Sequence, residues 1–254
     1  AADRVTRQTH GDGVLEIVEQ MIATDLVALG PQKRRRSLCL GRDLHGNEVI
    51  LPSRRASVVI AGDPDHTTQL GTALLERLCK AGYQFVVLDT RGDYVDFGKA
   101  VVFGTARNTP TVKEVLTALG KPDVQTVVDL TAMGHGERLA WVAALMEGLR
   151  GLRAKAGRPH WILVDEAHDL MPASANGDDA PSQGAENIIY ATDEPESLSP
   201  RVLAGVDGIA ACGPGARAIL ESLGKAIAWD ATVVPVEDAR EGEAVVWFRG
   251  TERP

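Results

Sequence analysis

Two adjacent acids, Asp165 and Glu166, follow directly on the short apolar run at residues 161–164. An unbroken apolar run of this length indicates a strand buried on both faces, as in a parallel sheet. The acids would then stand at the carboxyl end of the strand, where α/β sheets carry their chemistry. The simpler alternative is a buried strand that ends in solvated acids.

The stretch from Asp165 to Pro172 is more specific than an apolar run with one acid. Its sequence, Asp-Glu-Ala-His with Leu170, Met171 and Pro172 behind it, resembles the Walker B box of P-loop ATPases. The resemblance implies that Asp165 holds Mg²⁺ through water and that Glu166 polarises the attacking water. A working Walker B box also needs a phosphate cradle upstream in the chain.

The candidate cradle lies between an apolar run at residues 57–61 and a helical stripe of leucines that begins at Leu70. A strand, a turn led by glycine and a helix form the context of a P-loop. We therefore expect residues 62–69 to form the turn and to line a site for Mg-ATP. The expected nucleotide-binding residues are Gly62, Asp63, Pro64, Asp65, His66, Thr67, Thr68 and Gln69.

The candidate cradle departs from the P-loop pattern G-x-x-x-x-G-K-[S/T]. An ungapped alignment puts Thr67, Thr68 and Gln69 where the second glycine, the lysine and the hydroxyl residue belong. A one-residue deletion lets Thr68 supply the hydroxyl for Mg²⁺, but Thr67 then stands in place of lysine. Neither alignment supplies the positive charge for the phosphates. Asp63 and Asp65 add negative charge there, and each such contact near 4 Å costs roughly 1–4 kcal/mol. We expect weak or absent Mg-ATP binding.

A second apolar run, residues 85–88, ends at Asp89 in the sequence Asp-Thr-Arg-Gly-Asp-Tyr. It is similar to the D-P-x-G-E-Y motif of the HerA–FtsK group of P-loop ATPases, with Thr for Pro and Asp for Glu. With the Walker B-like box and a turn-rich hairpin at residues 37–51, the resemblance spans about residues 37–213. It implies a P-loop NTPase fold whose cradle is degenerate. It also places Thr192 or Asp193 near the position of the polar residue that senses the γ-phosphate.

The strand end at Asp89 permits a second hypothesis. Haloacid-dehalogenase-like phosphatases carry a nucleophilic aspartate at a strand end in the motif D-x-D-G-T, and Asp89, Gly92 and Asp93 look similar. Arg91 stands where that motif has its second aspartate, the general acid, and Asp93 stands where it has threonine. On this second hypothesis Asp89 would be the nucleophile.

The first 30 residues differ in character from the rest of the chain. Residues 2–6 (Ala-Asp-Arg-Val-Thr) and 11–14 (Gly-Asp-Gly-Val) resemble the C-terminal tail of Cof-type haloacid-dehalogenase-like phosphatases, behind which HerA-like domains occur as fusions. The resemblance implies that residues 1–30 are the helical tail of a preceding, covalently linked domain. Residues 31–254 would then form the NTPase-like domain, with the hairpin at 37–51 and the core at 57–248. The simpler alternative is an ordinary N-terminal helix.

Composition narrows the class of protein. The net charge of −8 disfavours a dedicated nucleic-acid binder, whose surface is usually basic. No run approaches eighteen apolar residues, so we expect no membrane span. The first residues lack the pattern of a signal peptide. Cys39, Cys79 and Cys212 lack metal-ligand spacing and are expected to be reduced thiols in a cytoplasmic protein.

The remaining elements alternate between strand and helix. Such alternation predicts an α/β fold, a P-loop NTPase-like three-layer sandwich with a mainly parallel sheet and a β-hairpin before the first core strand. The polar segment at residues 173–184 has almost no apolar residue and is expected to be a poorly ordered loop. Further strands are expected at residues 100–103, 126–130, 187–192, 208–213 and 244–248, and helices at 112–120, 137–156, 200–206 and 216–223.

Three functions are compatible with these features. The first is a degenerate HerA-like domain that acts as a regulatory or interaction module of a phosphatase. The second is an active Mg-ATPase with an atypical cradle, in which Glu166 is the base, Asp165 binds Mg²⁺ and a neighbouring subunit of a homo-oligomer supplies an arginine or lysine. The third is phosphatase activity that resides in the preceding haloacid-dehalogenase-like domain.

The P-loop hypothesis makes a prediction about architecture. Because the carboxyl ends of parallel strands share one edge of a sheet, the predicted strand ends must gather there. A structure with Asp165 and Gly62 at opposite edges would rule the hypothesis out. The residues expected at the shared edge are Gly62, Asp89, Asp129, Asp165 and Thr192.

Overall fold

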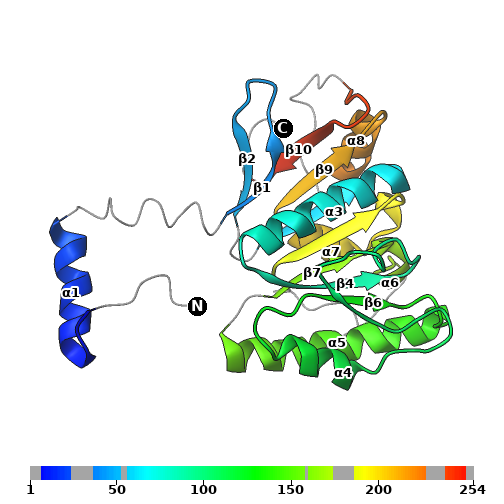
Figure 1. Ribbon diagram of the computed structural model, residues 1–254. Helices are drawn as coiled ribbons and strands as arrows, with labels where there is room; N and C mark the ends of the chain where they lie inside the picture. The colour runs from blue at the N-terminus through cyan, green and yellow to red at the C-terminus, as the bar shows by residue number, and fades with distance from the viewer. Residues whose placement is uncertain are drawn as a thin grey trace. The chain divides into compact units, whose positions relative to one another are not determined.

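A computed structural model of the 254-residue chain describes residues 7–23, 37–52, 56–157, 160–173, 186–226 and 238–249 (Figure 1). The chain divides into two compact units, residues 1–54 and residues 55–254, and each is described by itself. The predicted loop at 173–184 lies outside the described residues, apart from Ala173. Among the residues that the structure describes, every helix is too short or too polar to cross a bilayer.

The first unit contains the helix α1 (His10–Ala23) and a hairpin of the strands β1 (Ser37–Arg42) and β2 (Glu48–Pro52). The hairpin confirms the prediction for residues 37–51, and its strands pair antiparallel. Asp43 shapes the turn, because its Oδ1 atom accepts hydrogen bonds from the backbone N–H groups of His45 and Asn47 at 2.9 and 2.8 Å. Gly46 completes the turn with a φ of +83°, a conformation that glycine adopts without strain.

The second unit is an alternating α/β structure, as predicted. Its strands are β3 (Ser57–Ala61), β4 (Gln84–Asp89), β5 (Val101–Phe103), β6 (Thr126–Asp129), β7 (His160–Val164), β8 (Ile188–Thr192), β9 (Gly208–Cys212) and β10 (Ala244–Phe248). Its helices are α3 (Pro64–Lys80), α4 (Val112–Leu119), α5 (His135–Ala156), α6 (Ala167–Leu170), α7 (Pro200–Gly205) and α8 (Ala216–Ala226), with a 3₁₀ turn, η2, at Pro195–Ser197.

The strands form one eight-stranded sheet in the order β10-β9-β3-β8-β7-β4-β6-β5. All neighbours pair parallel except β10, which is antiparallel to β9 at the edge of the sheet. Every residue of β3, β4, β6, β7, β8 and β9 is buried. These findings confirm the predicted fold class, because strands covered on both faces are the mark of a parallel α/β sheet.

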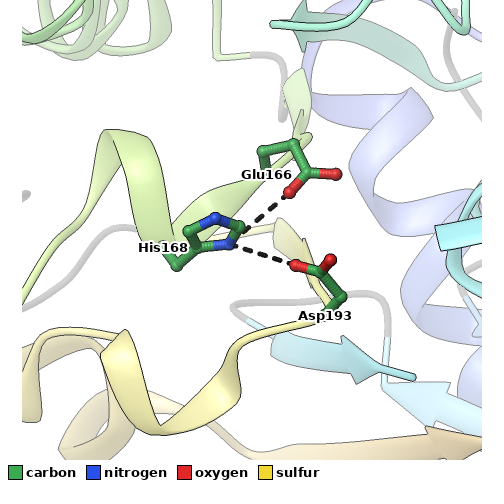
Figure 2. Close-up of side chains that lie close together, drawn as sticks. All are labelled: Glu166, His168 and Asp193. Atoms are coloured by element: carbon green, nitrogen blue, oxygen red, sulfur yellow. Dashed lines mark ion pairs between the residues drawn. The ribbon is translucent and has the colours of Figure 1, made fainter. Parts of the chain in front are cut away.

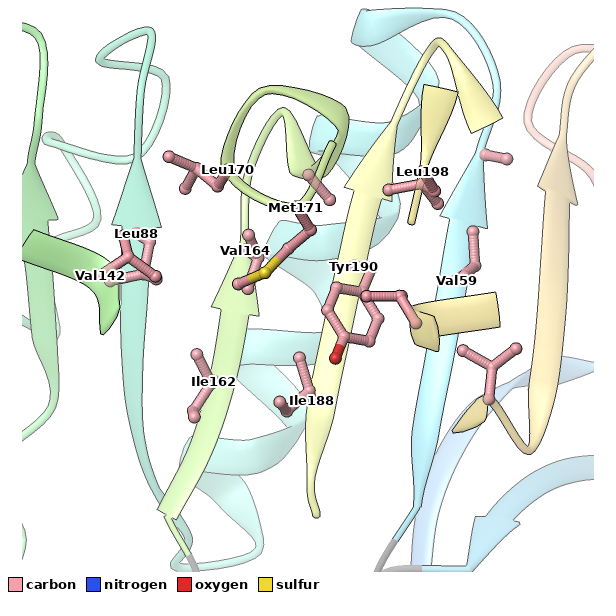
Figure 3. Close-up of a cluster of buried hydrophobic side chains, with 14 of the residues drawn as sticks. Val59, Leu88, Val142, Ile162, Val164, Leu170, Met171, Ile188, Tyr190 and Leu198 are labelled. Carbon is pink, nitrogen blue, oxygen red and sulfur yellow. The ribbon is translucent and has the colours of Figure 1, made fainter. Parts of the chain in front are cut away.

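Alternate side chains of a strand pack on opposite faces of the sheet. In β7, Ile162 and Val164 belong to the core that includes side chains of α4, α5, α7 and α8 (Figure 3). The helix α3 lies across the other face of the sheet (Figure 1). A Cβ atom on Gly71 of α3 would lie 3.2 Å from the Cδ1 atom of Leu163. The sheet is therefore the middle layer of three.

The predicted gathering of strand ends is confirmed. The strands β3, β8, β7, β4 and β6 are consecutive and parallel, so their carboxyl ends lie at one edge. The strand β8 lies between β3 and β7, and it therefore inserts Thr192 between Gly62 and Asp165. The architecture meets the condition that the P-loop hypothesis set.

The turn after β3 differs from the sequence-based expectation. Residues 62–69 were expected to form a long turn, but α3 begins at Pro64 and leaves only Gly62 and Asp63 between strand and helix. Proline favours the first position of a helix because its φ is already helical and its missing N–H is not needed there. Asp65 in the first turn adds a favourable interaction with the helix dipole.

We predict that Gly71→Ala destabilises the second unit. The new Cβ would lie 2.5 Å from the hydroxyl oxygen of Tyr94 and 3.2 Å from the Cδ1 atom of Leu163, and both of these side chains are buried. Overpacking of this kind lowers the free energy of unfolding by roughly 1–3 kcal/mol. Denaturant unfolding followed by circular dichroism measures the change.

Gly151→Ala in α5 is the matched control, because nothing lies within 4 Å of its added Cβ. The control should raise the free energy of unfolding by about 0.5–1 kcal/mol through helix propensity alone. Equal stability of the two variants would contradict the close packing of α3 on the sheet.

Candidate functional site

The carboxylate of Asp89 organises the first part of the shared edge. Its Oδ1 atom accepts backbone hydrogen bonds from Arg91, Gly92 and Asp93 at 3.2, 2.6 and 3.2 Å. Its Oδ2 atom accepts one from Tyr94 at 2.9 Å. Asp89 is fully buried, and although burial raises its pKa, these four bonds oppose the shift. A buried carboxylate engaged in this way offers no free oxygen to a substrate, so the geometry disfavours the nucleophile role.

The loop that Asp89 holds brings Arg91 to the Walker B-like box. The Nη1 atom of Arg91 donates to Oε1 of Glu166 at 2.8 Å, and its Nε atom lies 3.6 Å from Oδ2 of Asp93. The hydrogen bond with Glu166 raises the pKa of Arg91. This pair was not predicted from the sequence. The only local signal was an arginine two residues after a strand-end aspartate.

The backbone at Glu166 is in the left-handed region, with φ +46° and ψ 55°. For a residue with a Cβ this conformation costs on the order of 1–2 kcal/mol. The turn separates the two acids. Asp165 is 3% exposed, whereas the side chain of Glu166 is 13% exposed and reaches Arg91. Burial raises the pKa of Glu166, and the bond with Arg91 opposes the increase.

Asp165 is buried against other acids. Burial, followed by the charges of Asp89 and Glu166, raises the pKa of Asp165 to about 8. Its Oδ2 atom is buried without a hydrogen-bond partner among the described residues. Only the ionised form of this carboxyl would be a ligand for Mg²⁺, so an ion bound there would have to displace the proton.

The candidate cradle is a turn of two residues. A Cβ on Gly62 would lie 2.7 Å from the backbone oxygen of Cys212, so the close approach of β9 requires glycine. Thr67, a buried residue, belongs to the helix: its N–H donates to the backbone oxygen of Asp63 at 3.0 Å, and its Oγ1 donates to that of Pro64 at 3.0 Å. Thr68 and Gln69 also lie within α3.

His66 is held by the strand end of β9 and by a later segment. A Cβ on Gly213 would lie 2.7 Å from the His66 ring, so the ring packs directly on that glycine. The Nε2 atom of His66 lies 2.8 Å from Oε1 of Glu241. Asp63 and Asp65 are exposed on the same helical turn. The side chains gathered at the start of α3 thus include three acids and a histidine already paired with one of them.

His168 connects the Walker B-like box to the end of β8. Its Nδ1 atom lies 3.0 Å from Oγ1 of Thr192, and 3.6 Å from both Oε2 of Glu166 and Oδ1 of Asp193 (Figure 2). Thr192 also accepts the N–H of Glu194 at 3.0 Å. Thr192 and Glu166 were predicted site residues, and the structure brings both to His168, for which no role was predicted.

A cleft of about 500 Å³ opens beside α3, between that helix and residues 93–99. None of the eight residues of the candidate cradle contributes to its wall. The cleft therefore does not mark the expected nucleotide position.

No family model matches the chain, and no curated protein sequence does. Solved structures do. The chain is similar to VirB4 of Thermoanaerobacter pseudethanolicus, with a TM-score of 0.57, 11% identity and 84% and 94% of the two chains covered. It is also similar to the genome packaging NTPase B204 of Sulfolobus turreted icosahedral virus 2 in complex with ATP-gammaS, with a TM-score of 0.52, 14% identity and 72% and 88% covered. The chain has a P-loop NTPase fold.

The same packaging NTPase in complex with AMP matches with a TM-score of 0.52, 12% identity and 78% and 94% covered. At these identities the likeness concerns the fold alone. Within the P-loop NTPase fold of this chain, the strand end at Gly62 and the strand end at Asp165 flank Thr192. The sequence-predicted site residues therefore share one edge, but the loop between Gly62 and α3 has only two residues.

We predict that Asp165→Asn changes how stability depends on pH. In the unfolded chain an aspartate ionises near pH 3.9, whereas the folded pKa is about 8. Between these values the folded state binds more protons, so the free energy of unfolding of the original chain falls as pH rises. The variant should lack this fall and be more stable at pH 8 by roughly 2–4 kcal/mol, with little difference near pH 4.

Chemical denaturation from pH 4 to 8, in EDTA so that no metal ion contributes, measures this difference. Asp96→Asn removes an exposed carboxylate and is the control; its stability should follow that of the original chain at every pH. If the free energy of unfolding changed with pH in the same way for the original chain and for Asp165→Asn, a raised pKa at Asp165 would be contradicted.

Proposed function

We propose that this chain is a P-loop NTPase-fold module with a degenerate nucleotide cradle, which acts as a regulatory or interaction module and not as an efficient ATPase. The observation that carries the proposal is the two-residue turn, Gly62 and Asp63, between β3 and α3. A phosphate cradle needs several successive backbone N–H groups that converge on one anion. A helix that starts at Pro64 commits the N–H of Thr67 to a helical bond with Asp63 instead.

The residues at the edge do not fit Mg-ATP. Asp63, Asp65 and Glu241 gather at the start of α3, where phosphates would need positive charge. No lysine lies in the turn. Asp165, the expected Mg²⁺ ligand, is buried and has a pKa of about 8. The hydroxyl of Thr67 donates to the backbone oxygen of Pro64. We therefore assign Asp165 and Glu166 to the internal architecture of the edge.

The partner in this proposal is a covalently linked haloacid-dehalogenase-like domain, for which residues 1–30 would be the helical tail. Support comes from the resemblance of residues 2–14 to the tail of Cof-type phosphatases. A phosphatase activity of that domain is a compatible further proposal. A preceding coding sequence with the motif D-x-D-G-T would support the link, and an unrelated preceding domain would contradict it.

An active Mg-ATPase is the second candidate function. It is favoured by the grouping of Asp165, Glu166 and Thr192 at one edge, and by the solved structures of the packaging NTPase with ATP-gammaS and AMP. In this case Glu166 would be the base and Asp165 would need to lose its proton on Mg²⁺ binding. Arg91, 2.8 Å from Glu166, would offer a cation from within the chain.

Calorimetric titration with Mg-ATP tests the proposal. The unmodified chain should show weak or no binding. The combined substitutions Asp65→Gly, Thr67→Gly, Thr68→Lys and Gln69→Thr restore the P-loop pattern and allow the first turn of α3 to open. The charge-assisted lysine contact alone contributes roughly 1.5–3 kcal/mol, a gain of about ten- to a hundredfold in affinity.

The matched control carries the same substitutions without Thr68→Lys, so that only the lysine differs. Tight binding by the unmodified chain, lost in Glu166→Gln or Thr68→Ala, would instead establish the active ATPase. If the repaired chain is folded and binds nothing, the turn after β3 is not the remnant of a phosphate cradle.

A further inference from the structure

Glu166, His168 and Asp193 form a compact group with one ligand atom each (Figure 2). Glu166 and His168 come from the turn after β7 and from α6, and Asp193 follows the last residue of β8. The three ligand atoms lie within 4.8 Å of one another. The side chains of Glu166, His168 and Asp193 are 13%, 15% and 35% exposed. The first two are partly buried, and Asp193 stands on the solvent-exposed side of the group.

The distances from His168 to the two carboxylates fit a shared metal ion better than direct hydrogen bonds. Its Nδ1 atom lies 3.6 Å from a carboxylate oxygen of Glu166 and 3.6 Å from one of Asp193. Both separations exceed the length of an N–H···O hydrogen bond, about 2.7–3.2 Å. Nitrogen and oxygen ligands that each lie about 2.0–2.2 Å from a tetrahedral ion are separated by about 3.4 Å. A small adjustment of the side chains would bring all three atoms into contact with one ion.

The surroundings hold one of the ligands in orientation. Arg91 binds Oε1 of Glu166 at 2.8 Å and leaves Oε2 to face His168. Arg91 thereby orients this ligand, as outer partners do in metal sites. Thr192 contacts the same Nδ1 atom of His168 at 3.0 Å, so an ion bound to Nδ1 would take the place of this hydrogen bond. A cation between the two carboxylates, which both face the same imidazole nitrogen, would lessen their mutual repulsion.

We propose that Glu166, His168 and Asp193 bind one divalent transition-metal ion of the Zn²⁺ class. An imidazole nitrogen with two carboxylates suits Zn²⁺ and its neighbours, whereas Mg²⁺ and Ca²⁺ prefer oxygen alone. The site differs from the Mg²⁺ position expected at Asp165 and Thr68. It does not rest on the proposed function, because it involves no nucleotide.

Metal titration of the full chain tests the site. After treatment with EDTA and removal of the chelator, Zn²⁺ is added in a calorimeter, and Co²⁺ is added with the visible absorption recorded. We expect one ion per chain and a Co²⁺ spectrum with the intense bands of a low-coordinate site. Excess Mg²⁺ should not displace the ion. Absence of Zn²⁺ binding at micromolar concentration would overturn the proposal.

Variants locate the ion. His168→Ala and Asp193→Asn should each lower the affinity for Zn²⁺ at least tenfold and abolish the intense Co²⁺ bands. His135→Ala removes an exposed histidine of α5 and should change neither. Circular dichroism of the metal-free variants checks that they fold. If His168→Ala does not fold, the Zn²⁺ affinity of Asp193→Asn decides the test, because Asp193 is exposed. Zn²⁺ affinity unchanged in Asp193→Asn would place the ion elsewhere and overturn the proposal.

Discussion

The four backbone hydrogen bonds to Asp89 hold together the functional edge of this molecule. They bend the chain after β4 into a compact loop, and that loop delivers two side chains to opposite sides. Arg91 reaches the Walker B-like turn and pairs with Glu166. Tyr94 turns inward and packs against Gly71 of α3. One buried carboxylate thus links the sheet, the helix α3 and the acidic edge.

The balance of charge at this edge depends on that link. Asp89, Asp93, Asp165 and Glu166 lie near one another. Burial, followed by the charges of the other three acids, raises the pKa of Asp165. Arg91 is the cation that the loop supplies to Glu166 and Asp93. Protonation of Asp165 relieves part of the remaining repulsion, because a buried carboxyl becomes neutral before it tolerates unpaired charge.

Much of the fold could be predicted from the sequence. The buried strands were recognisable because runs such as residues 58–61 and 161–164 are apolar without alternation, and a parallel sheet then places their ends together. The start of α3 could not be predicted in the same way. The apolar stripe begins only at Leu70, and the helical signals at Pro64 and Asp65 are also common in turns.

The site was only partly predictable, for a different reason. Glu166 and Thr192 were named from a motif, but their partners are set by pairing between strands. His168 and Asp193 are far apart in the sequence and meet only because β7 and β8 are neighbours. Arg91 reaches Glu166 across the pairing of β4 with β7. Local sequence patterns do not encode such contacts between strand ends.

The short turn between β3 and α3 limits how far the domain could change its conformation. In an NTPase, a loop around the γ-phosphate lets the domain adopt one shape before hydrolysis and another after it. A turn of two residues, with glycine pressed against Cys212, has no slack for such an exchange. A domain built in this way would keep the same shape at any ratio of ATP to ADP in the cell.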